Sequence, residues 1–161
     1  MPAPPKKMHH LQAINSIPSQ YSEFRNVLWT GESSQLVVMT VPVGGDIGEE
    51  VHTVDQHLIF TSGVCKAIVG GEEKEVKAGD LVIVPQGTKH NCTSPLLEHF
   101  LVIQRLRSVI NTGPTPLCLF TVYAPAEHAE TTVHKTKEEG DELEDAGKDE
   151  APEWASKDKK D

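Results

Sequence analysis

The chain has 161 residues, a formal net charge of −9 and a hydrophobic fraction of 37%. This length suits one domain with its own core, flanked by short tails. Basic residues do not cluster as they do in proteins that bind nucleic acid, and no window approaches the ~20 apolar residues of a membrane span. The start of the chain has no apolar signal region, and three widely spaced cysteines suit reduced thiols, so we expect a soluble cytoplasmic protein.

Residues 1–18 are rich in proline and polar residues and have no strand or helix period. We expect a flexible N-terminal arm over this range, whose end could form an edge strand.

Residues 19–126 contain short runs of Val, Ile, Leu and Phe separated by glycine pairs and prolines. Strands at this spacing, with turn residues between them, predict an all-β sandwich or barrel. The pairs Gly44-Gly45 and Gly70-Gly71 suit tight turns that need positive φ. The expected strands fall in these segments: 24–31, 34–45, 57–63, 64–71, 74–80, 81–87 and 117–125.

The last part of the chain, 127–161, is acidic and poor in large apolar residues. From Lys135 to Asp161 it has 11 Asp or Glu and 6 Lys, which is −5 of the net charge. Such a segment buries too little surface to offset its ordering entropy, so we expect a disordered acidic tail. A docking tail for a basic partner is the functional alternative. The histidines of this region, His128 and His134, are expected at the surface or at helix caps.

Four side chains form a candidate metal site. Alternate residues of a strand share a face, so Glu50 and His52 point the same way, and Gln56 has the same parity. His90 follows a turn marked by Pro85 and Gly87. Two imidazoles and oxygen donors that converge inside a barrel would bind a borderline divalent ion such as Mn, Fe, Zn or Ni.

These residues resemble the two motifs of the cupin superfamily. The second motif, G-x5-P-x-G-x2-H-x3-N, is matched by Gly79, Pro85, Gly87 and His90. The first, G-x5-H-x-H-x3,4-E-x6-G, is matched by the residues at 52 and 63 but altered at two ligand positions. The runs GEEVHTVDQ, VINTG, YAPAEH and TVHKTK are similar to small cupins labelled mannose-6-phosphate isomerase-like. The resemblance implies a single jelly-roll barrel of the RmlC-like type with one metal ion at its mouth.

The departures from the motif change the charge of the site. Glu50 stands where the first histidine is expected, and Gln56 stands at the glutamate position. With a divalent ion these ligands are formally +1, which favours a substrate with anionic or paired oxygens. His57 would satisfy the longer spacing of the motif and is an alternative fourth ligand, although strand parity turns it away unless a bulge intervenes. Asp55 is expected to be a turn residue.

Residues 92–108 interrupt the second motif. Their removal would join His90 and Asn91 to Val109, Ile110 and Asn111 and restore the H-x3-N spacing. The segment is strongly apolar, which is unusual for an exposed loop. A retained intron of 51 nucleotides and a genuine insertion over the barrel mouth are both consistent with this pattern.

Two functions are compatible with this site. One is a metal-dependent enzyme, isomerase-like or oxygenase-like, that acts on a small polar molecule such as a sugar or an oxyacid, with Glu50 as a ligand or as a catalytic base. The other is a non-catalytic module that binds a small molecule or a metal, because no second carboxylate is evident near the motifs. The resemblance also implies a homodimer that covers exposed sheet edges.

Overall fold

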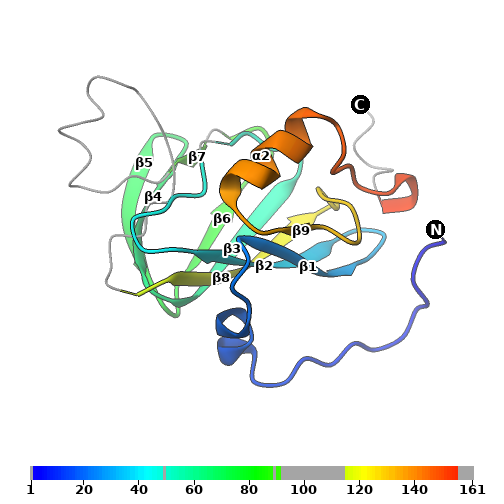
Figure 1. Cartoon of the computed structure of the whole chain (residues 1–161), viewed down its shortest axis with the longest axis horizontal. Helices are drawn as coiled ribbons and strands as arrows, with labels where there is room; N and C mark the ends of the chain where they lie inside the picture. Colours follow the sequence, from blue (N-terminus) through cyan, green and yellow to red (C-terminus); the bar gives the residue numbers. More distant parts are fainter. Residues whose placement is uncertain (1, 49, 89, 92–114, 156–161) are drawn as a thin grey trace.

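The computed structural model describes residues 2–48, 50–88, 90–91 and 115–155. Its strands form two antiparallel sheets that curve around one core (Figure 1). The larger sheet has the order β6-β3-β8-β2-β1-β9 and the smaller has the order β5-β4-β7. The strands are β1 (Arg25–Thr30), β2 (Gln35–Val41), β3 (Asp55–Ser62), β4 (Val64–Val69), β5 (Glu72–Lys77), β6 (Leu81–Val84), β7 (His90–Asn91), β8 (Leu117–Ala124) and β9 (Val133–His134).

Strand β3 shows how the sequence pattern specifies the barrel. Gln56, Leu58 and Phe60 alternate with less buried neighbours and face the interior. Strand β3 lies between β6 and β8, and Leu58 and Phe60 pack into one apolar cluster with residues of the other strands. The expected all-β barrel is confirmed, and the side chains of Phe60 and Tyr123 are buried in its interior.

The hairpin between β4 and β5 has a two-residue turn formed by Gly70 and Gly71. Both have positive φ, 56° and 85°, as the hairpin geometry requires. The predicted function of this glycine pair as a tight turn is therefore confirmed.

The N-terminal segment contains no strand in its described part. It has two single-turn helices, η1 (Ile14–Ser16) and η2 (Pro18–Gln20), so the edge strand considered for its end is wrong. The proline at the start of η2 fixes φ in the helical range and cannot donate to a strand ladder, which explains the difference.

The C-terminal segment is ordered over residues 127–155, and the expectation of a disordered tail is wrong there. It contains β9, helix α2 (Lys137–Asp145) and the turn η3 (Glu153–Ala155), and α2 lies above β1 and β9 in Figure 1. Thr136 caps α2 by accepting a hydrogen bond from the Glu139 amide. This segment is ordered despite its low apolar content, because buried polar groups hold it against the barrel. Residues 156–161, like the interruption at 92–108, lie outside the described residues.

Asp149 holds the end of the C-terminal segment against residues 128–132 and against β9 of the larger sheet. Its carboxylate accepts hydrogen bonds from His128 Nδ1 at 2.7 Å, from the Ala129 amide at 2.9 Å and from the Thr132 hydroxyl, and it lies 3.3 Å from His134 Nε2. Burial alone would raise the pKa of Asp149, but these partners hold it well below its ordinary value. His128 and His134 are thus buried partners of a carboxylate, and the expectation of surface histidines is wrong.

Helix α2 approaches the barrel closely at Gly140. A Cβ atom at this position would lie 2.8 Å from His134 Nδ1 and 3.3 Å from an Arg25 guanidinium nitrogen. Only glycine lets the helix backbone come so near to these two side chains, so α2 covers them without displacing either.

We expect Asp149→Asn to destabilise the protein by about 2–3 kcal/mol at neutral pH, because it removes the buried carboxylate that accepts hydrogen bonds from His128 and from the Ala129 amide. The folded pKa of Asp149 is depressed, so its stabilising contribution is present above its unfolded pKa of ~4 and is lost as pH falls below that value. The difference between wild type and variant in urea unfolding should therefore shrink in acid. Asp145→Asn, at the exposed end of α2, is the control and should differ little from wild type. An equal loss in both variants would contradict this account.

Candidate metal centre

Backbone hydrogen bonds hold the two sequence motifs side by side. Glu50 and His90 form an antiparallel bridge, with N to O distances of 3.4 and 3.3 Å. The Gly87 amide donates to the His52 carbonyl at 2.7 Å, and Gly87 has a φ of 70°, which the turn after Pro85 requires. The first motif and the second therefore meet through their main chains, and the side chains at 50, 52 and 90 are brought together.

Three predicted ligands converge in space. The Glu50 carboxylate Oε2 lies 2.8 Å from His52 Nε2 and 3.8 Å from His90 Nε2. One ligand atom from each of the three residues lies within 4.8 Å of the others. This is an arrangement that one divalent ion could bridge.

The orientation of His90 leaves a lone pair directed at this cluster. Its Nδ1 lies 3.2 Å from the Thr88 carbonyl, which can only accept, so Nδ1 carries the proton. In the neutral ring Nε2 is then unprotonated, and Nε2 is the atom nearer to Glu50. A backbone carbonyl that fixes the tautomer in this way is common behind metal-binding histidines.

Charges at the site are arranged around Glu50. Burial alone would raise the pKa of Glu50, but contacts with His52, His90 and Arg25 hold it well below its ordinary value. Burial would lower the pKa of His52, but Glu127 and Glu50 raise it to about 9. Without a metal, the imidazolium of His52 supplies the positive charge that a divalent ion would otherwise supply to these carboxylates.

Gln56 lies inside the barrel and His57 does not. Gln56 is 1% exposed, and its Nε2 donates to the Thr121 hydroxyl at 2.9 Å and to the Tyr123 hydroxyl at 3.2 Å. Its Oε1 is buried without a hydrogen-bond partner among the described residues. The register of β3 is continuous from Asp55 to Phe60, so no bulge turns His57 inward, and Gln56 is the better candidate for a fourth ligand.

The expectation that Asp55 is a turn residue is wrong, because it is the first residue of β3 and pairs with Ala124. Asp55 Oδ1 accepts a hydrogen bond from the Gln86 amide at 2.9 Å, which ties the start of β3 to the turn of the second motif. The side chain is therefore used to fix the backbone next to the site.

The donor set suits a divalent ion. A carboxylate, two imidazoles and an amide oxygen without a partner are all ligands that Mn, Fe, Zn and Ni accept. An unpaired buried amide oxygen costs free energy, and a coordinated cation would remove that cost. The residues present thus fit the metal site that the motifs imply.

The sequence did not indicate that the C-terminal segment helps to build this site. A cavity of about 260 Å³ opens beside Glu50 and His52 and is lined also by Glu127, His128, Glu144, Asp149 and Glu150. Beneath it, Arg25 is 2% exposed and lies 2.7 Å from the Glu144 carboxylate and 3.8 Å from that of Glu50. The only available signal was the resemblance of YAPAEH and TVHKTK to a cupin subgroup, which continues past the last strand.

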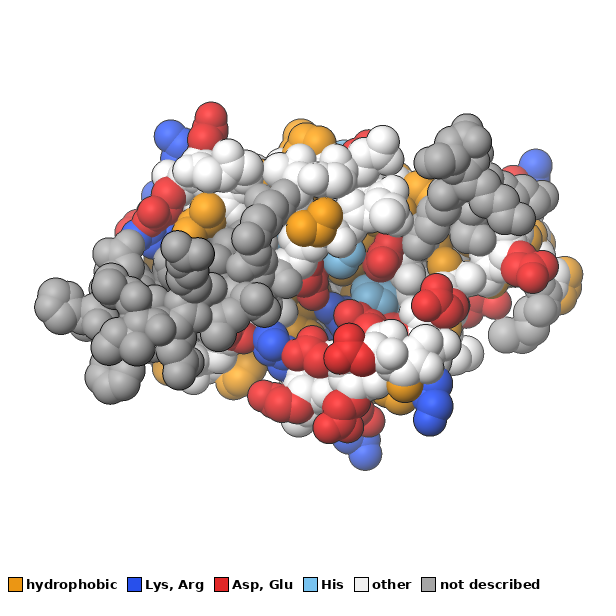
Figure 2. Space-filling model, turned by 90° about the horizontal axis from the view of Figure 1, so that it is seen from above, with side chains coloured by type: hydrophobic (Ala, Val, Ile, Leu, Met, Phe, Trp, Pro, Cys, Tyr) orange, Lys and Arg blue, Asp and Glu red, His pale blue; other side chains and the backbone are white. Residues whose placement is uncertain are grey.

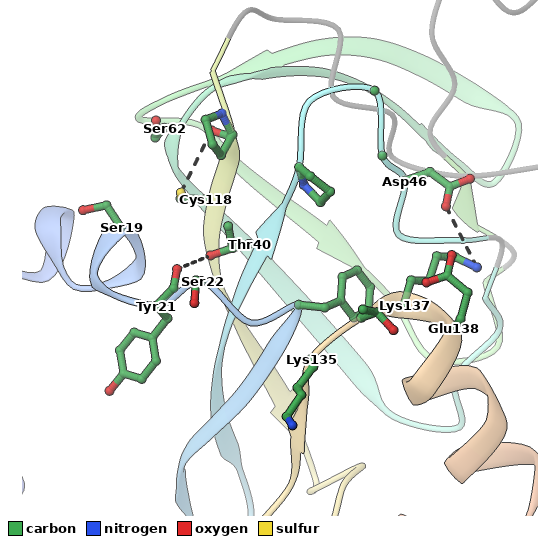
Figure 3. A pocket seen from close by; sticks show the side chains of 16 residues that line it. Ser19, Tyr21, Ser22, Thr40, Asp46, Ser62, Cys118, Lys135, Lys137 and Glu138 are labelled. Carbon is green, nitrogen blue, oxygen red and sulfur yellow. Dashed lines mark hydrogen bonds and ion pairs between the residues drawn. The ribbon is translucent and has the colours of Figure 1, made fainter.

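A larger cavity, of about 790 Å³, lies elsewhere (Figure 3). It is bounded by η2, β2, β8 and the start of α2, with Tyr21, Thr40 and Lys137 among its walls. Neither group of ligating side chains found among the described residues belongs to it. Size alone therefore does not identify the site, because the candidate ligating residues line the smaller cavity.

No helix among the described residues is long and apolar enough to cross a bilayer.

Comparison with known proteins agrees with the fold and the motifs. Residues 37–98 match the family model described as the cupin domain. The chain is 36% identical over 139 residues to YrkC of Bacillus subtilis, an uncharacterized protein, covering 82% of this chain and 66% of that one. It is 31% identical over 111 residues to the uncharacterized protein L612 of Acanthamoeba polyphaga mimivirus, covering 65% of this chain and 58% of that one. The chain thus spans 66% and 58% of the length of these two relatives.

Among solved structures, the crystal structure of BH2720 from Bacillus halodurans matches with a TM-score of 0.71 and 29% identity. The match covers 87% of this chain and 98% of that one. Two motifs meet at one site inside an antiparallel barrel, and the family model matches residues 37–98, so this chain contains a cupin domain.

Proposed function

We propose that this cupin is a metal-dependent enzyme that acts on a small polar molecule such as a sugar or an oxyacid. One divalent ion would be held by Glu50, His52 and His90, with the amide oxygen of Gln56 as the fourth ligand. The observation that carries the proposal is the convergence of three ligand atoms within 4.8 Å at the edge of a cavity. A bound divalent ion would polarise a carbonyl or hydroxyl oxygen of the substrate.

The side chains around the ion have distinct tasks in this proposal. Glu50 is held ionised by its partners, which suits a ligand better than a base, because a carboxylate with a depressed pKa takes up protons poorly. Burial raises the pKa of Glu144, which lines the same cavity, so Glu144 is better matched to proton transfer. Glu127 Oε1 lies 3.7 Å from His52 Nδ1 and would orient that ring toward the ion.

A non-catalytic binding module is the second candidate. One observation favours it: the carboxylates of Glu144 and Asp149 are already paired with Arg25 and with buried histidines. Groups used in this way are less free to move protons. Turnover with the bound metal, measured on a panel of sugars and oxyacids, separates the two candidates.

We expect the protein to bind about one equivalent of a divalent metal, measured by elemental mass spectrometry after removal of any tag. The double variant His52→Ala/His90→Ala should lose this metal, and Gln56→Leu should bind it about tenfold more weakly, the scale on which supporting groups affect metal affinity. His57→Ala is the matched control and should keep the metal, because its ring lies on the other face of β3. Metal retained in the double variant, or absent from the wild type after reconstitution, would contradict the assignment.

We also propose a homodimer formed through the edge strand β6. Leu81 and Ile83 share one face of this strand and are 55% and 56% exposed, which leaves an apolar edge open to pairing. Light scattering behind size exclusion should show a dimer for the wild type and a monomer for Leu81→Lys/Ile83→Lys. Val43→Lys, which changes an exposed valine outside the strands, should stay dimeric. A monomeric wild type at micromolar concentration would overturn this proposal.

A further inference from the structure

The cavity beside the metal ligands is strongly acidic. Five of the eight residues that line it carry carboxylates: Glu50, Glu127, Glu144, Asp149 and Glu150. Figure 2 shows acidic side chains gathered around histidine side chains in a hollow on this face. Three of the five carboxylates come from the segment after α2 begins, so the ordered C-terminal segment gives the cavity its charge.

No lysine or arginine lines this cavity in the part of the chain that the structure describes. Arg25 is the nearest buried cation, but its guanidinium is turned to the protein. It donates to Glu144 at 2.7 Å and to His134 Nδ1 at 2.9 Å, and it pairs with Glu50. Arg25 therefore neutralises part of the acidic wall without offering a site for an anionic ligand.

His128 adds a further acceptor to this wall. Its Nδ1 faces the Asp149 carboxylate and must carry the proton, so Nε2 of the neutral ring holds a lone pair. Nε2 is buried without a hydrogen-bond partner among the described residues. Burial and the nearby Arg25 lower the pKa of His128, which agrees with a neutral ring. Six of the eight lining residues, the five carboxylates and His128, thus offer hydrogen-bond acceptors, which favours a ligand that donates hydrogen bonds.

The charges can be summed. Five carboxylates contribute −5, Arg25 contributes +1 and a divalent ion would contribute +2, which leaves −2. Without the ion, the five carboxylates and Arg25 sum to −4. The +1 obtained from the motif ligands alone is therefore reversed by residues of the C-terminal segment.

We propose that this cavity takes a small molecule that carries a protonated amine next to a hydroxyl or carbonyl oxygen, and that it rejects anions of the same size. The inference rests on the proposed metal-dependent function and narrows its substrate class, setting oxyacids aside. The cavity of about 260 Å³ is smaller than the ~300–1,000 Å³ of pockets for drug-sized ligands, which suits a molecule of metabolite size. The amine would lie among the carboxylates, and the oxygen would lie toward the metal ligands.

Three probes of similar size and different charge test the proposal: glucosamine in its protonated form, glucose and gluconate. Binding is measured by calorimetry and by thermal shift, on the full chain with metal and on the metal-free protein. We expect glucosamine to bind most tightly and gluconate at least about tenfold more weakly. The carboxylates of the cavity attract the ammonium group and repel the carboxylate of gluconate, and the difference in binding free energy is of this order. Gluconate binding as well as glucosamine or better, or no binding of any probe, would overturn the proposal.

Two single-charge variants show where the preference arises. Glu150→Gln removes one carboxylate of the cavity and should reduce the ratio of glucosamine to gluconate affinity by about threefold. Glu142→Gln removes the same charge from α2 outside the cavity and should leave the ratio unchanged. An equal effect of both variants would assign the preference to net charge and overturn the proposed cavity.

The metal content of the same samples separates this inference from the proposed function. Bound metal with a preference for gluconate would refute the charge selectivity alone. Absent metal with a preference for glucosamine in the metal-free protein would refute the metal site and support the selectivity, because the carboxylates outweigh Arg25 with or without the ion.

Discussion

The guanidinium of Arg25 is buried where three parts of the molecule meet. It projects from β1 and contacts Glu50 of the first motif, Glu144 of α2 and His134 of β9. Each contact matters because a buried carboxylate without a positive partner costs several kcal/mol. His52, His90 and Arg25 together hold the pKa of Glu50 low, so Glu50 stays ionised inside the barrel mouth. Helix α2 can lie against the sheet because Arg25 also pairs with Glu144. Arg25 therefore links the candidate ligands to the C-terminal segment.

This arrangement links fold to chemistry through charge. The carboxylates of the segment 127–155 close one side of the cavity, while β3, β7 and the loop that carries Glu50 and His52 supply the ligands. Asp149 keeps the segment in place through His128 and His134 rather than through apolar contacts. The barrel positions the candidate ligands, and in our proposal the C-terminal segment decides which molecules can approach them.

The barrel and the convergence of Glu50, His52 and His90 could be predicted from the sequence because both depend on local patterns. Alternation along β3 places Gln56 inside and His57 outside, and the turn at Gly87 brings His90 back to Glu50. The order of the C-terminal segment could not be predicted in the same way. Amino-acid composition indicates only how much apolar surface a segment can bury. This segment is stabilised instead by buried polar contacts of Asp149 and Arg25. The partners of Arg25, His134 and Glu144, are 109 and 119 positions away in the sequence.

The position of a bound metal tests the account most directly. Crystals of the protein loaded with its metal should give an anomalous difference peak about 2.0–2.2 Å from His52 Nε2, His90 Nε2 and a Glu50 carboxylate oxygen. The same map should place the C-terminal segment over the cavity, with Arg25 against Glu50. A peak instead at the second group of ligating side chains, His128, Glu144 and Asp149, or no peak in crystals of metal-loaded protein, would contradict it.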